Sequence, residues 1–303
     1  MDKTRRNLIK GMLTGGTLLA LGVPGMAPAI IVNPVASGSV HPSRLLLGNT
    51  PISEVFIKGA NAAWAAHTHS QQGLLPIAKL EDILFDNPAG TADLLRQPRP
   101  LRWIAITDEA HAAILTELIR NIDGRLLALG FHIYSANDAL IPLRHRWTTA
   151  SPAYSVGEKL ATMLIQNQPQ FSIVENFLEK PVVRNEDEAL PIAGFSAYRS
   201  TEQDVRDLHC AGLPPSEANV LIGEKTAHSW QPRFSGTSSG GPDVPKLENW
   251  VEMTSFALVT TALGINSHQT SCTSRAFVCR SNQRNLHTEV FAGTHFVSFI
   301  FDV

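Results

Sequence analysis

The chain has 303 residues, a formal net charge of -2, 44% hydrophobic residues and 17% charged residues. This is the composition of a folded globular protein, and it argues against intrinsic disorder. The near-zero net charge offers no basic surface for DNA or RNA, so we expect no nucleic-acid partner. Length alone is compatible with one elaborated domain or with two closely packed ones.

A charged segment followed by an uncharged apolar run opens the chain. Arg5 and Arg6 precede residues 11–23, a run of about 13 residues that is shorter than the roughly 20 needed to cross a bilayer. Ala27-Pro28-Ala29 then offers the small-x-small pattern that a signal peptidase reads. We therefore expect a cleaved export signal over residues 1–29 and no permanent membrane anchor.

The segment Thr4-Arg5-Arg6-Asn7-Leu8-Ile9-Lys10 resembles the twin-arginine translocation (Tat) motif, in which two arginines precede apolar residues and often a lysine. The resemblance covers only the signal. It implies that the Tat export machinery is a partner during translocation and that the mature protein is periplasmic or secreted. It also implies folding before export, often around a cofactor. A Sec signal or an ordinary amphipathic helix is the alternative interpretation.

The remainder of the chain predicts an extended linker over residues 30–43 and a mature globular domain over residues 44–303. Residues 231–245 are dense in Gly, Ser and Pro, which is typical of a long loop or an internal boundary. The pattern of elements favours an α+β or mixed α/β fold, built as a single elaborated domain with a largely antiparallel mixed sheet.

The clearest local unit is a strand over 101–106, a helix and a second strand over 125–135. Thr107 or Asp108 can cap the helix, whose apolar residues recur at spacings of three and four until Asp123-Gly124. We expect a third strand over 139–148, antiparallel to the second, and Pro142 favours an edge position for it.

Further along the chain, periodicity predicts helices over 156–166 and 203–210 and a longer helix from Pro245 to Gly264. The C-terminal pattern around Ala292-Gly293 predicts a hairpin whose last strand, 296–301, is buried.

The pair His67 and His69 is a candidate metal site, because imidazoles two residues apart on a strand project to the same side and can share an ion. The cofactor is unknown from the sequence, and a metal ion is the kind of cofactor against which the sequence argues least. More distant ligands are needed to complete such a site. Carboxylates such as Asp108 or Asp138 could serve, together with the histidines His111, His132, His145, His268, His287 and His295. Two polar residues in a loop or at a helix end are the alternative.

Two further motifs suggest chemistry. Gly236-Thr237-Ser238-Ser239-Gly240 matches the G-x-S-x-G elbow of serine hydrolases. Residues 238–241 also resemble the serine-rich core of the amidase signature family, for which Lys159 and Lys225 are conceivable partner lysines. Pro232 before the motif and Pro242 after it do not fit the required strand and helix, so a flexible Gly-Ser loop is the competing interpretation.

Three cysteines, Cys210, Cys272 and Cys279, remain in a chain that we expect to be exported. A disulfide between Cys272 and Cys279 is chemically reasonable there, and three buried thiols are the alternative. From all these patterns we expect a non-enzymatic binding or accessory protein of the cell envelope. The alternative is an exported metal-dependent hydrolase that uses His67 and His69.

Overall fold

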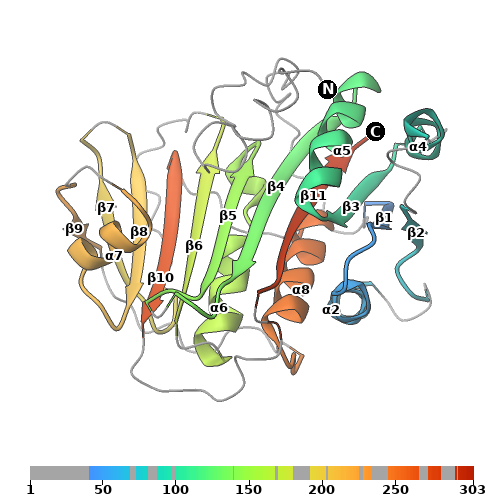
Figure 1. The fold of residues 1–303 in the computed structure, drawn as a ribbon. Helices are drawn as coiled ribbons and strands as arrows, with labels where there is room; N and C mark the ends of the chain where they lie inside the picture. The colour runs from blue at the N-terminus through green and yellow to red at the C-terminus, as the bar shows by residue number, and fades with distance from the viewer. Residues whose placement is uncertain are drawn as a thin grey trace.

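The computed structural model describes residues 41–68, 73–80, 87–96, 100–138, 140–167, 170–179, 192–202, 204–224, 228–233, 245–265, 272–280, 291 and 293–303. These residues form one eleven-stranded sheet with helices on both faces (Figure 1). Six of the ten strand pairs are antiparallel and four are parallel. The prediction of a single domain with a largely antiparallel mixed sheet is confirmed.

The strands do not follow chain order across the sheet. In spatial order they are β2 (Ile77–Lys79), β1 (Ser43–Leu47), β3 (Arg102–Thr107), β11 (His295–Asp302), β4 (Arg125–Tyr134), β5 (Leu143–Thr149), β6 (Gln170–Phe177), β10 (Ser274–Arg280), β8 (Arg206–Ala211), β7 (Ser196–Ser200) and β9 (Gln231–Pro232). The last two strands of the chain therefore occupy interior positions. Segments before and after residues 231–245 belong to the same sheet, so this stretch does not separate two sheets.

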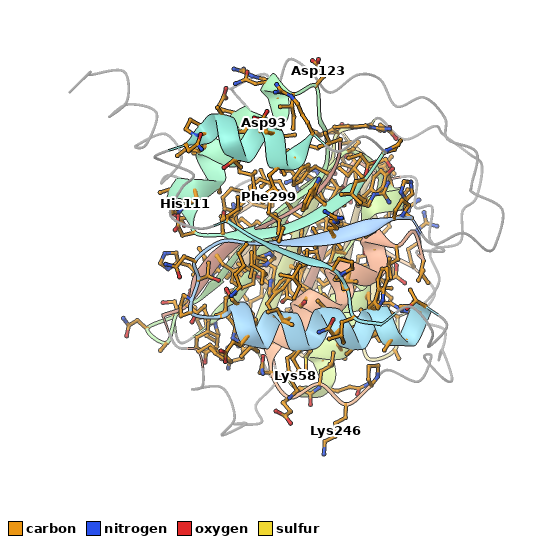
Figure 2. All side chains as sticks on the ribbon, turned by 90° about the vertical axis from the view of Figure 1, so that its right-hand side faces the viewer. Lys58, Asp93, His111, Asp123, Lys246 and Phe299 are labelled. Atoms are coloured by element: carbon orange, nitrogen blue, oxygen red, sulfur yellow. The ribbon has the colours of Figure 1, made fainter. Side chains whose placement is uncertain are left out.

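Helices cover the two faces of the sheet separately. The inner face carries α2 (Ser53–His67), α6 (Gly157–Asn167) and α8 (Trp250–Ala262), which share the largest apolar core with it. The outer face carries α4 (Pro88–Leu95), α5 (Glu109–Asn121) and α7 (Pro215–Leu221), and a short 3-10 turn spans Pro152–Tyr154. Figure 2 shows the layers edge on, with Lys58 on the helix below the sheet and Asp93 and His111 above it. Among the described helices, none combines the length and the apolarity needed to span a bilayer.

The strand-helix-strand unit of β3, α5 and β4 is confirmed. The Asp108 side chain accepts a hydrogen bond from the His111 backbone N–H at 2.9 Å, which caps the helix as expected. Leu115, Leu118 and Ile119 form the buried stripe of α5, and they pack on outer-face side chains such as Phe299 (Figure 2). Periodicity and a capping residue together were sufficient to define this element.

Three expectations about the elements are wrong. The segment predicted as a helix over 203–210 contains strand β8, in which Asp207 points to the inner face and pairs with Arg199. Strand β5 lies inside the sheet, because Pro142 precedes its first residue and removes no ladder hydrogen bond. The last strand, β11, is buried as expected, but its two edges pair with β3 and β4 and not with a hairpin partner from the residues just before it. In addition, the last inner helix begins at Trp250 with Asn249 as its cap, five residues after Pro245.

The two long inner helices, α2 and α8, cross at a glycine. A Cβ atom on Gly59 would lie 2.3 Å from the carbonyl oxygen of Glu252 and 2.8 Å from its Cα. Both are backbone atoms, so a side chain at this position must push the helices apart. Next to this crossing, the Ser255 hydroxyl donates to the Phe56 carbonyl oxygen at 2.6 Å.

We expect Gly59→Ala to lower the free energy of unfolding by about 1–2 kcal/mol. Overpacking costs about 1–3 kcal/mol, whereas alanine gains only up to about 1 kcal/mol in helix propensity. Urea unfolding monitored by circular dichroism measures the change. Ala65→Gly, at an exposed position of the same helix, isolates the propensity contribution. A stabilised Gly59→Ala variant would show that the crossing tolerates a methyl group.

Candidate functional site

The sheet contains a point at which its connections diverge. Strands β1 and β3 are parallel neighbours, with Leu45 opposite Ile104. After β1 the chain passes through α2 on the inner face and enters β2, at the edge of the sheet. After β3 it passes through α5 on the outer face and enters β4, which lies in the opposite direction along the sheet (Figure 1). Such divergence opens a crevice at the carboxyl ends of the two strands, which is where open α/β sheets bind ligands.

A pocket of about 230 Å³ occupies this crevice. Three chain segments line it: one after β1, one after β3 and one before β11. The lining residues are Asn49, Thr50, Pro51, Ile52, Asp108, Gly293, Thr294 and His295. Ile52 is only 1% exposed and anchors the wall in the inner core. Hydrogen bonds of 2.9 and 3.0 Å between Tyr134 and the backbone of residues 293–294 tie the third segment to β4.

Asp108 supplies the carboxylate of the pocket. Its Oδ1 accepts from the His111 backbone N–H at 2.9 Å, and its Oδ2 lies 2.6 Å from the His111 Nδ1. Burial raises the pKa of Asp108, but hydrogen bonds from the backbone and ring of His111 lower it by more. The net pKa is below the ordinary value, so the carboxylate is ionised at neutral pH.

Two hydroxyls beside the pocket, those of Thr50 and Ser53, are engaged with each other. The Thr50 Oγ1 lies 3.0 Å from the Ser53 Oγ, and Ser53 also donates to the Thr50 carbonyl oxygen at 2.8 Å. Neither contact involves a histidine or lysine that could activate a nucleophile. These contacts therefore give neither hydroxyl a base that could activate it.

A buried polar network lies beneath the crevice. The Phe296 ring, next to the lining residue His295, packs on Phe56 with ring centroids 6.2 Å apart and on His132 at 4.5 Å. The His132 Nε2 lies 2.8 Å from the Ser298 Oγ, and its Nδ1 lies 2.7 Å from the His145 Nδ1. All three polar residues of this network have zero solvent exposure.

Both histidines of the network are neutral at pH 7. Burial lowers the pKa of His145 to about 3. Burial, and then the repulsion that a protonated His145 would exert, lowers the pKa of His132 well below its ordinary value. Two neutral rings can share one proton between their Nδ1 atoms, so one ring donates and the other accepts. The His145 Nε2 has no hydrogen-bond partner among the described residues.

The order Ser298, His132, His145 matches the hydrogen-bond order of a catalytic triad, with a histidine in place of the usual acid. However, helices α2 and α8 cover these side chains, and no substrate atom can reach Ser298 in this structure. The Trp147 ring lies over Gly130, the strand neighbour of Ser298, and a Cβ atom on Gly130 would lie only 2.4 Å from that ring. We therefore interpret the network as part of the core. From the sequence, His132 and His145 were expected only as separate candidate metal ligands, and no sequence motif links them to Ser298.

A second set of buried polar groups joins β6, β10 and α6. The Arg275 guanidinium contacts the Glu175 carboxylate at 3.1 Å and that of Glu158 at 3.2 Å. Glu175 also accepts from the backbone N–H groups of Val156 and Gly157 at 2.9 and 2.8 Å, so it caps the first turn of α6. These charges are paired with each other and serve to hold the helix against the sheet.

The predicted metal ligands are not brought into a described cluster. His67 ends α2, its ring centroid lies 6.1 Å from that of Phe256, and its buried Nε2 has no described partner. Burial, followed by the positive charge of Lys159, lowers the pKa of His67. His69 lies outside the described residues. Within the described part of the chain, no group of three or more His, Cys, Asp or Glu residues could hold a metal ion.

Of the remaining candidate ligands, the His111 ring contacts Asp108 and His295 lines the pocket. Arg5 and Arg6, the motif at 236–240 with Ser238, and Lys225, His268 and His287 lie outside the described residues. The proposed bridge between Cys272 and Cys279 is not formed. Cys279 lies in β10, about 16 Å of extended strand from Ser274. Two further residues cannot return Cys272 to within the roughly 7 Å between Cα atoms that a disulfide requires.

Acid should destabilise the protein between about pH 6.5 and pH 3. Burial also lowers the pKa of His209 to about 3, so His145 and His209 both stay neutral in the fold. Below pH 6.5 these two histidines bind protons in the unfolded chain but remain unprotonated in the folded chain. The free energy of unfolding therefore falls by up to about 1.4 kcal/mol per pH unit for each histidine.

Urea unfolding at pH 7, 6.5, 6 and 5.5 tests this expectation. In the native protein the His209 ring stacks on Phe277, with the ring centroids 4.7 Å apart. His209→Phe keeps an aromatic ring at this position and removes one titrating group. The free energy of unfolding of this variant should fall less steeply with decreasing pH, by an amount that corresponds to about one proton fewer taken up on unfolding. An identical slope in both proteins would mean that His209 titrates normally in the fold.

No family model, curated protein or solved structure matches the chain. The pocket at the divergence of β1 and β3 is thus the feature of the described structure on which a function can be argued.

Proposed function

We propose that this chain is an exported, non-enzymatic binding protein that holds a small ligand in the crevice between the ends of β1 and β3. The observation that carries the proposal is the position of the pocket at the point where the sheet connections diverge. The rigid strands fix the pocket, whereas its walls are loops that can vary without changing the fold.

The dimensions of the pocket limit the ligand. A volume of about 230 Å³ equals that of seven or eight water molecules at roughly 30 Å³ each. This is smaller than the roughly 300–1,000 Å³ of sites for drug-sized molecules, so the ligand is a small metabolite or the terminal group of a larger molecule.

Export is supported by the twin-arginine pattern at Arg5 and Arg6 and by the apolar run that follows it. A binding protein in the periplasm would meet small molecules that enter from outside the cell. The metal-dependent hydrolase remains the alternative, and it requires His69 and ligands beyond those described.

The first test of binding uses three probes with the same five-carbon chain, pentylammonium, pentan-1-ol and pentanoate. We expect at least one of them to shift the backbone amide NMR signals of residues 49, 50, 52 and 293–295 in a saturable manner. Asn49→Trp should fill the crevice mouth and weaken this binding at least tenfold. Asp93→Trp places the same ring at an exposed site on α4 and should leave binding unchanged (Figure 2).

Binding of no probe at these residues would contradict the proposed site. Equal weakening by Asn49→Trp and Asp93→Trp would also contradict it, because the effect would then not depend on the crevice.

The export part of the proposal is tested with Arg5→Lys/Arg6→Lys. Charge is kept in this variant, but the arginine pair of the Tat motif is lost, so nearly all of the protein should stay in the cytoplasm. Fractionation and immunoblotting measure its distribution. Lys10→Arg serves as the control and should be exported normally. Normal export of the double variant would rule out the Tat route.

A further inference from the structure

We propose that the crevice selects a positively charged ligand, a small ammonium compound with a short aliphatic body, whose charge pairs with Asp108. This inference rests on the proposed binding function. Among the described residues that line the pocket, Asp108 is the only carboxylate, His295 is the only titratable base, and none is Lys or Arg. Its side chain is 40% exposed, so the charge faces the open space and is accessible to a ligand.

Asp108 retains capacity for another hydrogen bond. A carboxylate offers about four lone-pair sites. The His111 backbone N–H and ring each use one, and the backbone N–H of Ala110 also contributes a hydrogen bond. At least one site therefore remains for an ammonium donor, and an ion pair of this kind is stronger than a neutral hydrogen bond.

The helix termini near the crevice do not reverse this preference. The N-terminus of a helix carries roughly half a positive charge. At α5, Asp108 itself caps this terminus and contributes a full negative charge. At α2, Glu54 in the first turn offsets the corresponding half charge. The carboxylate is the larger effect, so the crevice favours a cation over an anion.

The rest of the pocket suits an aliphatic body. Pro51 and Ile52 present apolar surface, and Ile52 is fixed in the core. Asn49, Thr50 and Thr294 add amide and hydroxyl groups that can orient a polar substituent. A pocket that holds seven or eight waters has space for a chain of about six or seven non-hydrogen atoms.

The same three probes test this selectivity, because they differ in charge and not in length. At low salt we expect pentylammonium to bind at least tenfold more tightly than pentan-1-ol, equivalent to about 1.4 kcal/mol, and pentanoate to bind more weakly than either. Raising the salt concentration from 10 to 150 mM should weaken ammonium binding selectively, since the Debye length falls from roughly 30 to 8 Å.

Asp108→Asn should make pentylammonium and pentan-1-ol bind equally. Asparagine caps helices as well as aspartate does, so the variant removes the charge and keeps α5. Circular dichroism and the midpoint of urea unfolding verify that the fold is retained. Asp93→Asn removes an exposed carboxylate from α4 and should preserve the tenfold preference.

The outcomes separate this inference from the proposed function. Equal binding of all three probes in the crevice overturns the charge preference and leaves the binding function intact. Preferential binding of pentanoate overturns it as well and would make the α2 terminus the dominant charge. Failure of every probe to bind overturns both proposals. A tenfold preference that persists in Asp108→Asn would assign the selectivity to another group.

Discussion

The placement of β11 between β3 and β4 is the constraint on which the rest of the structure depends. Hydrogen bonds along both edges of this strand join two halves of the sheet that otherwise have no contact at this point. Arg102 reinforces the junction, because its guanidinium binds both oxygens of Asp302 at 2.7 and 2.9 Å and also donates to the Ala262 carbonyl oxygen at 2.8 Å. One end of β11 is thereby fixed to α8, and the other end forms a wall of the crevice.

The same strand explains how polar groups are accommodated in the core. Ser298 satisfies one nitrogen of His132, whose other nitrogen faces His145, so that neutral groups satisfy one another. Farther along the sheet, Glu175 and Arg275 are buried with opposite charges. The two solutions differ in their cost. Removing one partner of a buried ion pair typically costs about 3–5 kcal/mol, whereas one unsatisfied neutral group costs about 1–3 kcal/mol.

Local patterns predicted some of this structure and could not predict the rest. Helix α5 was predictable because its cap and its apolar stripe are close in sequence. Strand β8 was not, because Asp207 looks like a solvent-facing residue until Arg199 on β7 pairs with it. The crevice likewise joins Asp108 to residues 49–52 and 293–295, which only the sheet order brings together. Of the predicted metal pair, only His67 lies in the described structure. The crevice residues Asp108 and His295 stood out in the sequence only as a possible helix cap and as one of several distant candidate ligands.

The interior position of β11 also has a consequence for the order in which the protein can be assembled. During synthesis β3 and β4 emerge long before β11. In the finished sheet they do not pair with each other, because β11 lies between them and pairs with both. The emerging chain therefore exposes the edges of β3 and β4 until β11 becomes available to pair with them. A chain with this topology cannot complete its core until β11 has been added, and the sheet without β11 has exposed edges that a chaperone can shield.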